Sequence, residues 1–216
     1  KDSTFQALTA KKYGLNPLLV NSRTCDLSAI GRKNIDNLRS LGFDAIEVLP
    51  NPQVRSKLNL IGLKEVGDIS WPEHIGMFTI PFTIALKFDI PIIFYGENPQ
   101  HEYGGPEHFV NNMHQDRRWL EEIGGTLGMR LEDVLLSEDV KTKDLNIYKF
   151  PDSKDLTDKN IRAYYLGYFF PWNGLSNYII AQAHGMLSYG KPVEGSLVDY
   201  ENLDNHQNGI HEYLKI

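Results

Sequence analysis

The sequence predicts an α/β fold with a doubly wound, mainly parallel sheet and a mostly helical C-terminal segment. Three short apolar runs, at residues 18–20, 45–49 and 90–95, are separated by segments with helical spacing. Each separating segment is long enough to cross over a sheet, and no Asn-Gly hairpin signal joins two of the runs. We therefore expect the three runs to be parallel, neighbouring strands.

The first helix is expected to begin at Ser3 and to end near Gly14. Asp2 and Ser3 suit the cap position and the positive end of the helix dipole, and Gly14 suits the C-terminal cap. A short strand at 15–20 follows. Helix, tight turn and strand form the second half of a βαβ unit, so we expect the natural protein to carry another strand before Lys1.

The next elements alternate in the same way. Apolar residues at helical spacing predict a helix at 30–41, and the strand at 45–49 follows it. Further helices are expected at 54–64 and at 72–88, the latter kinked or restarted at Pro81.

The run at 90–95 is almost wholly apolar and lies between turn signals, which is typical of a strand buried on both faces. Beyond it we expect a strand at 147–150 and helices at four places, 116–122, 127–136, 178–186 and 206–216. We divide the chain into a domain at 1–150 and a helical segment at 151–216.

Composition limits the classes of function. The 216 residues suffice for one sizeable core. A net charge of −6 argues against nucleic acid as the main partner, because phosphate binding needs clustered Lys and Arg. A single cysteine, Cys25, fits a reducing cytoplasm, and no apolar run reaches the length of a membrane span. We expect a cytoplasmic protein that binds neither nucleic acid nor membrane.

Lys1-Asp2-Ser3 is a candidate phosphate site at the start of the first helix. A helix N-terminus offers backbone N–H groups and a positive dipole, and the Lys and Ser side chains add donors. Asp2 would hold Mg²⁺ against phosphate oxygens. The alternative is an ordinary helix cap.

Polar residues also follow two of the predicted strands. Gly96, Glu97 and Asn98 come directly after the run at 90–95, and Asn21 follows the strand that ends at Val20. Ligands of open parallel sheets bind just past the carboxyl ends of the strands, and Gly96 lets the backbone approach a ligand closely. The alternative is a pair of ordinary surface loops.

Five segments together resemble the N-acetyl sugar amidotransferase family of the PP-loop ATP pyrophosphatase superfamily, whose fold is Rossmann-like. They are GRKNIDNLRSLGFD (31–44), GDISWPEHIGMFTIPF (67–82), IFYGENPQHEYGG (93–105), DRRWLEEIGG (116–125) and YLGYFFPWNG (165–174). Lys1-Asp2-Ser3 resembles the end of the superfamily's Ser-Gly-Gly-x-Asp-Ser loop, whose first half is not in this sequence. We expect the natural protein to run on at both ends.

The resemblance implies an ATP- and Mg²⁺-dependent reaction in the biosynthesis of lipopolysaccharide O-antigen or nonulosonic-acid sugars. An acetamido group of a sugar is adenylated on its oxygen by ATP with release of pyrophosphate, ammonia attacks the resulting imidate carbon, and AMP leaves. Asp2 and Glu97 are the catalytic candidates, with Glu97 binding Mg²⁺ or orienting ammonia. Lys1, Ser3, Asn21, Gly96 and Asn98 are the candidates for nucleotide binding.

Substrate candidates are cationic or aromatic. Arg117, Arg118 and Arg162 would bind a sugar carboxylate or a phosphate, although a helical ion-pair face is the alternative for the first two. The adenylated intermediate must be kept from water, so aromatic pocket walls are expected. The aromatic candidates are Trp71, Phe78, Tyr103, Tyr165 and Trp172, of which Tyr103 and Trp172 are assigned to the substrate, and core packing is the alternative for each.

The resemblance also implies protein partners. The chain has no nucleophile elbow for a glutaminase of its own, so ammonia is expected from a separate glutaminase through a barrel-shaped channel subunit. Two other functions remain open: a different PP-loop chemistry such as tRNA thiolation, and a non-catalytic scaffold that docks the glutaminase partners.

Overall fold

The computed structural model describes residues 1–23, 26–99, 106–107, 111–115, 117–136 and 140–215. It is an α/β structure that divides into two compact units, one made of residues 1–47 with 172–216 and the other of residues 48–171. The first unit thus combines both ends of the sequence. This division falls after residues 47 and 171, whereas the sequence predicted a domain boundary at residue 150, which stays a prediction.

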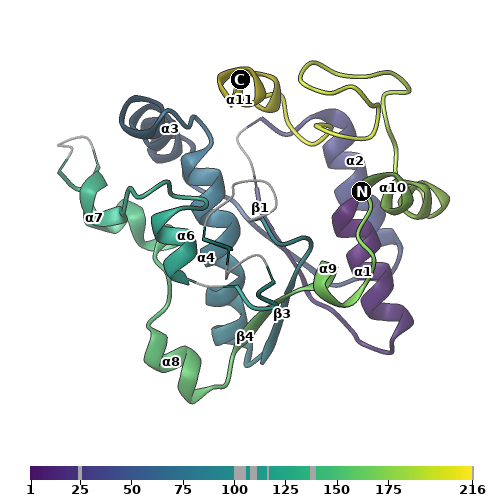
Figure 1. The fold of residues 1–216 in the computed structure, drawn as a ribbon, viewed down its shortest axis with the longest axis horizontal. Helices are drawn as coiled ribbons and strands as arrows, with labels where there is room; N and C mark the ends of the chain where they lie inside the picture. Colours follow the sequence, from purple (N-terminus) through teal and green to yellow (C-terminus); the bar gives the residue numbers. More distant parts are fainter. Residues whose placement is uncertain (24–25, 100–105, 108–110, 116, 137–139, 216) are drawn as a thin grey trace. The chain divides into compact units, whose positions relative to one another are not determined.

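The first unit contains helices and a short two-stranded sheet (Figure 1). Its elements are α1 (Asp2–Lys12), β1 (Leu19–Ser22), α2 (Ala29–Ser40), β2 (Ala45–Val48, whose last residue falls in the other unit), α10 (Gly174–Ala183) and α11 (Asn208–Lys215). β1 and β2 are hydrogen-bonded neighbours, and the Leu19 N–H donates to the Asp44 carbonyl at 2.9 Å. The predicted pairing of these two strands is confirmed, although β1 begins later than expected and includes Asn21.

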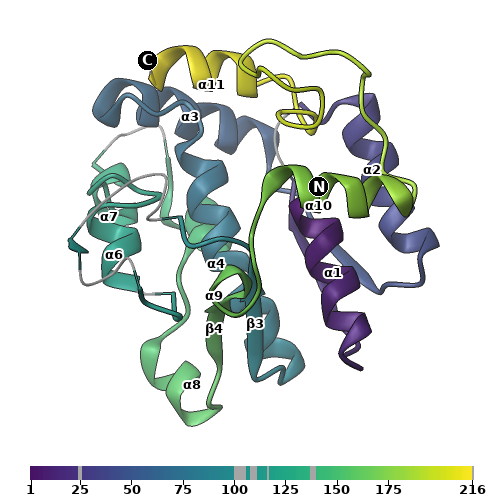
Figure 2. The same ribbon diagram turned by 45° about the vertical axis from the view of Figure 1, so that its right-hand side comes forward.

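α1 and α10 lie side by side, although the sequence separates them by some 160 residues (Figures 1 and 2). The buried residues of α1 are all small: Thr4, Ala7 and Ala10. On α10, Ala181 is fully buried. Small side chains allow two helix backbones to approach closely, so this face of α1 suits close packing against α10.

α2 is fixed in the first unit by polar contacts to the C-terminal part of the chain. Ser28 caps it, accepting from the Gly31 N–H at 2.8 Å and donating to the Leu203 carbonyl. The Asn34 amide donates to the Leu187 carbonyl at 3.0 Å and accepts from the Leu187 N–H at 2.8 Å. Both ends of this buried amide are therefore satisfied.

The second unit carries the remaining elements. They are α3 (Pro52–Val66), α4 (Trp71–Phe88), β3 (Ile92–Tyr95), α6 (Arg117–Glu122), α7 (Leu131–Val134), the 3-10 helix η2 (Thr142–Tyr148), α8 (Ser153–Asp158), β4 (Arg162–Tyr165) and α9 (Leu166–Phe169). α4 is the central helix, since it contacts α3, η2 and β3 (Figure 1). Among the described residues, no helix is both long and apolar enough to cross a membrane.

α4 continues through Pro81, so the predicted helix at 72–88 is confirmed without a restart at the proline. Proline has no N–H, and the carbonyl four residues earlier, of Met77, loses its usual donor. The Tyr95 hydroxyl lies 3.4 Å from this carbonyl and 3.2 Å from that of Phe78. A side chain from β3 thus compensates for the missing hydrogen bond inside α4.

β3 pairs in parallel with β4, with Ile92 opposite Arg162 and Tyr95 opposite Tyr165. The expected row of three parallel neighbours is not found among the described residues, because β1 pairs with β2 and β3 pairs with β4. The sequence of β4, Arg-Ala-Tyr-Tyr, is short and begins with a charge, so its pattern gave no strand signal.

Two local predictions in the second unit are wrong. Ile93 is buried but its neighbour Ile92, on the opposite face, is 50% exposed, so β3 is not buried on both faces. The strand expected at 147–150 is replaced by η2, in which the Asp144 carboxylate accepts from the Lys141 N–H at 3.2 Å. This cap favours a helical turn over an extended chain.

The predicted helices differ from the observed ones mainly at their ends. α10 starts four residues earlier than expected, because the Asn173 side chain caps it by accepting from the Ser176 N–H at 3.0 Å. The helix expected at 127–136 is only the short α7. α8 was not predicted, although Asp152 is a clear N-cap and accepts from the Lys154 N–H at 2.7 Å.

Candidate functional site

The start of α1 differs from the starts of several other helices. α2, α3, α8 and α10 each begin after a Ser, Asn or Asp whose side chain accepts from a backbone N–H of the first turn. The N-cap of α1 is Lys1, whose side chain makes no cap hydrogen bond. Lysine is a donor only, so its side chain offers no acceptor to the N–H groups of the first turn.

Both carboxylate oxygens of Asp2 are engaged. The Lys1 ammonium lies 2.7 Å from Oδ2, and the Asn177 side chain donates from Nδ2 to Oδ1 at 2.8 Å. The Asp2 side chain is nevertheless 33% exposed. The carboxylate is therefore held in one orientation by two neighbours while one side of it faces solvent.

Lys1 lies between two acidic side chains, since its ammonium is also 3.4 Å from Glu201 Oε1. Burial lowers the pKa of the Lys1 ammonium, but the hydrogen bond to Asp2 and the charges of Asp2 and Glu201 outweigh it, so the pKa is raised. Gly174 makes room for the chain, because a Cβ there would lie 3.2 Å from Lys1 Cε. We call these four residues, Lys1, Asp2, Asn177 and Glu201, the α1 cluster.

Asn177 is fully buried on α10. An ionised carboxylate only accepts, so the amide must turn Nδ2 toward Asp2, which leaves Oδ1 pointing elsewhere. Oδ1 has no hydrogen-bond partner within the part of the chain that the structure describes. An unsatisfied buried acceptor costs about 1–3 kcal/mol, close to the roughly 1.5–3 kcal/mol that a hydrogen bond to a charged group contributes. We therefore expect Asn177 to add little net stability.

The α1 cluster fits a phosphate group and Mg²⁺. Uncapped N–H groups, a lysine and the exposed Ser3 supply donors for phosphate oxygens. Magnesium commonly binds through one or two carboxylates together with substrate phosphates, and Asp2 is such a carboxylate. No group of three or more His, Cys, Asp or Glu that would hold a metal occurs among the described residues.

Trp172 joins this site through an aromatic contact. Its ring meets that of Phe5, one turn into α1, in an edge-to-face arrangement with centroids 5.5 Å apart. Asn21 lies in β1, half-buried. Of the residues predicted from sequence, the structure thus brings Lys1, Asp2 and Trp172 near one helix start.

The loop after β3 belongs to the second unit. Its Gly96 carbonyl accepts from the Gly167 N–H at 2.9 Å, Asn98 is buried and Glu97 is exposed. Ser3 belongs to the first unit. The predicted approach of Glu97 to Ser3 therefore stays a prediction.

The arginines of α6 form an ion-pair face. Arg117 Nε lies 2.7 Å from Glu121 Oε1, and Arg118 Nε lies 2.9 Å from Glu122 Oε1, in both cases one turn apart. The Arg117 guanidinium also covers the Phe150 ring at 4.9 Å. These contacts agree with the structural alternative for the pair. The third candidate, Arg162, is exposed at the start of β4.

Most of the aromatic candidates are core residues. Trp71, Phe78 and Tyr165 are 0%, 4% and 2% exposed, and the Trp71 indole N–H donates to the Thr126 carbonyl at 3.1 Å. For these three, core packing is the better interpretation. Tyr103 lies outside the described residues.

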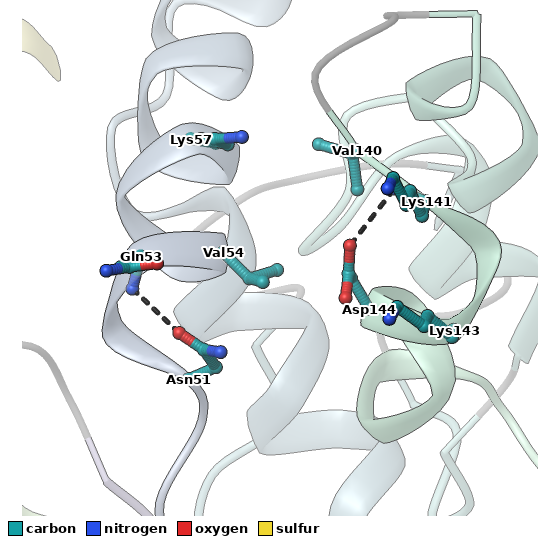
Figure 3. A pocket seen from close by; sticks show the side chains of 8 residues that line it. All are labelled: Asn51, Gln53, Val54, Lys57, Val140, Lys141, Lys143 and Asp144. Atoms are coloured by element: carbon teal, nitrogen blue, oxygen red, sulfur yellow. Dashed lines mark hydrogen bonds between the residues drawn. The ribbon is translucent and has the colours of Figure 1, made fainter.

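A pocket of about 250 Å³ opens beside the start of α3 (Figure 3). Its lining consists of Asn51, Gln53, Val54, Lys57, Val140, Lys141, Lys143 and Asp144. Polar groups on both sides are already used internally, because Asn51 accepts from the Gln53 N–H and Asp144 from the Lys141 N–H. Among the described residues, those that the sequence predicted for the functional site do not line this pocket.

Sequence reasoning missed a second polar cluster, whose residues come from α3, α4 and η2. Glu73 Oε1 is 3.7 Å from Arg55 Nε, and Glu73 Oε2 accepts from Asn59 Nδ2 at 2.8 Å. Burial raises the pKa of Glu73, and burial followed by the Glu73 charge raises that of the Tyr148 phenol. Arg55 Nε, Glu73 Oε1 and the Tyr148 hydroxyl have no hydrogen-bond partner among the described residues. We call Arg55, Asn59, Glu73 and Tyr148 the α4 cluster.

Asn177 and Glu201 were also missed. Neither lies in a recognisable motif, and their role depends on the packing of the C-terminal part of the chain against α1. Asn173 carried a usable signal, since an Asn directly before a helical segment is a preferred N-cap.

Comparison with known proteins adds no assignment to this geometry. A scan against models of protein families finds none that matches the chain, and a search of the curated proteins finds no match either.

Proposed function

We propose that this chain is an ATP-dependent amidotransferase that converts an acetamido group of an N-acetyl sugar into an acetamidino group. The observation that carries the proposal is the start of α1, where Lys1-Asp2-Ser3 forms an uncapped helix N-terminus with a held, partly exposed carboxylate. The five segments that resemble the N-acetyl sugar amidotransferases support the choice of reaction.

The roles of the residues follow from their chemistry. The first-turn N–H groups, Lys1 and Ser3 would bind the phosphates of ATP, and Asp2 would hold the magnesium ion. Magnesium would neutralise charge that develops on the leaving pyrophosphate. Glu97 is proposed to orient ammonia or to add a second carboxylate, and Trp172 with the arginines is proposed to contact the sugar.

The finer description of the fold belongs to the same proposal. A doubly wound PP-loop sheet would unite the strands that form two separate pairs among the described residues. A cytoplasmic location, a glutaminase and a barrel-shaped ammonia channel are proposed from the resemblance. Lipopolysaccharide or nonulosonic-acid biosynthesis is the proposed pathway class.

The test is pyrophosphate release by the purified protein. ATP, Mg²⁺ and ammonium would be supplied with a panel of nucleotide-linked and free N-acetyl sugars, and the sugar product would be examined by mass spectrometry for replacement of one oxygen by NH. We expect release with at least one sugar and its loss in Asp2→Asn. The matched control is Ser176→Ala, an exposed position on α10.

The same experiment separates the alternatives. Glutamine should not replace ammonium unless a glutaminase is added. A scaffold would release no pyrophosphate with any sugar. A tRNA-thiolating enzyme would release it with tRNA and with none of the sugars. Unchanged release in Asp2→Asn would remove the α1 site from the reaction.

A further inference from the structure

We infer that Asn177 is a positioning residue that sets the orientation of Asp2 for magnesium and phosphate binding. The inference rests on the proposed function and extends it to α10, which the sequence had not connected with nucleotide chemistry. Its starting point is the 2.8 Å hydrogen bond from Asn177 Nδ2 to Asp2 Oδ1.

The contact joins two helices that are far apart in sequence. Asn177 lies one turn into α10, and its backbone N–H donates to the Asn173 carbonyl at 2.9 Å, so the helix itself fixes its position. The side chain is completely buried, whereas that of Asp2 is 33% exposed. A rigid, buried donor thus holds a carboxylate whose other side faces solvent.

Comparison with Asn34 separates positioning from ordinary structural hydrogen bonding. The Asn34 amide is also buried, but its donor and its acceptor both meet the backbone of Leu187. Within the part of the chain that the structure describes, the Asn177 amide uses its donor alone, and this donor meets a charged side chain. An amide retained for stability would be expected to satisfy both ends. The single contact of Asn177 instead controls one oxygen of Asp2.

The other oxygen of Asp2 is less firmly held. Its partner, the Lys1 ammonium, ends a flexible side chain and is shared with Glu201. When phosphate attracts Lys1, Oδ2 becomes available to a cation, while Asn177 keeps Oδ1 in place. The two partners of Asp2 therefore have different roles, one exchangeable and one fixed.

The experiment measures binding through thermal stability. The melting temperature is recorded with ATP at a series of Mg²⁺ concentrations, and the readout is the Mg²⁺ concentration that gives half of the ATP-induced shift. Asn177→Leu, which keeps the branching and removes the donor, should raise this concentration by about tenfold to a hundredfold, the usual effect of losing a residue that orients a metal ligand.

Asn34→Leu is the matched control. It removes a buried amide from the same unit and should lower the melting temperature without changing the Mg²⁺ dependence. The exchanged variant, Asp2→Asn with Asn177→Asp, restores an amide–carboxylate pair with the carboxylate on α10. Because position 177 is fully buried, the relocated carboxylate should lower the melting temperature, and the Mg²⁺ dependence of the wild-type protein should not return.

The possible outcomes are distinct. A wild-type protein without any Mg²⁺-dependent ATP shift would overturn the phosphate site itself. A normal shift in the wild type with an unchanged half-point in Asn177→Leu would overturn the positioning role alone. Recovery of both the melting temperature and the Mg²⁺ half-point in the exchanged variant would show that the carboxylate works equally well on α1 or α10. This result would also overturn the positioning role of Asn177.

Discussion

The α1 cluster and the α4 cluster contain similar groups in different surroundings. Each has a cation, a carboxylate and an asparagine that donates to that carboxylate. The Asp2 side chain is 33% exposed, whereas that of Glu73 is 11% exposed. Asp2 retains contact with water and has two close partners. Glu73 has lost most of its water, and the nearest guanidinium nitrogen is 3.7 Å away.

This difference separates the proposed ligand site from a cluster that is expected to affect stability alone. A partly solvated carboxylate at a helix start can exchange one partner for a ligand at small cost. The buried carboxylate of Glu73 depends on the nearby Arg55 cation. Without a partner, desolvation disfavours its charge by several kcal/mol. The following predictions test this contrast, beginning with the largest expected effect.

Arg55→Leu should destabilise the protein strongly, by about 3–5 kcal/mol, because it leaves the Glu73 carboxylate buried without its cation. Urea denaturation provides the free energy of unfolding. The control is the double variant Arg55→Leu with Glu73→Leu, which should recover most of the loss. Equal losses in the single and the double variant would mean that packing around Arg55, and not charge, dominates the α4 cluster.

Glu73 should make stability depend on pH. Because burial raises its pKa in the folded protein above the ordinary value of 4.5, the folded state binds this proton more tightly than the unfolded state. Stability should therefore fall as pH rises from about this value, by at most about 1.4 kcal/mol per pH unit for one carboxyl. Glu73→Gln should remove this component while leaving the other titrations in place. Melting temperatures between acidic and neutral pH would measure it, and parallel curves for the two proteins would contradict the assignment.

Lys1→Met should have a small effect on stability, about 1 kcal/mol or less, because its partners Asp2 and Glu201 are 33% and 47% exposed and can be solvated in place of the ammonium. The ATP-induced shift in melting temperature should nevertheless decrease. A large loss in the free energy of unfolding, measured by urea denaturation, would contradict this. It would show that the ion pairs of the α1 cluster matter for stability as much as those of the α4 cluster, despite the exposure of Asp2.

Arg118→Ala should have the smallest effect, about 0.3–0.5 kcal/mol, since its ion pair with Glu122 spans one helical turn and its side chain is 78% exposed. Because stability hardly changes, the variant also tests substrate binding. A raised KM for the sugar with unchanged kcat would restore Arg118 to the site, and unchanged kinetics would leave it as an ion-pair partner.

The helices were largely predictable, because their signals are local. Apolar spacing located α2, α3 and α4, and a glycine with φ of +80° at Gly14 follows α1 as expected. Strand partners were less predictable. The apolar pattern identified β3, but its partner β4 is a short Arg-Ala-Tyr-Tyr segment about 70 residues later. Pairing between segments so distant depends on the chain between them and not on either pattern.

The candidate site divides in the same way. Lys1, Asp2 and Ser3 were identified from the chemistry of a helix start, which requires only neighbouring residues. Asn177 and Glu201 reach the same place from α10 and from the loop before α11, and no spacing in the sequence predicts that meeting.

The sequence by itself thus determined the positions of most helices, three of the four strands (β1, β2 and β3) and the residues at the start of α1. The spacing of apolar residues, the helix caps and the Gly or Pro residues that end an element all act within a few residues. For this reason they can be recognised in the sequence alone. Only the tertiary structure decided that α1 lies against α10, that β3 pairs with β4, and that Asp2 and Glu73 differ in solvation. These outcomes depend on which surfaces are buried together, and burial is a property of the folded chain.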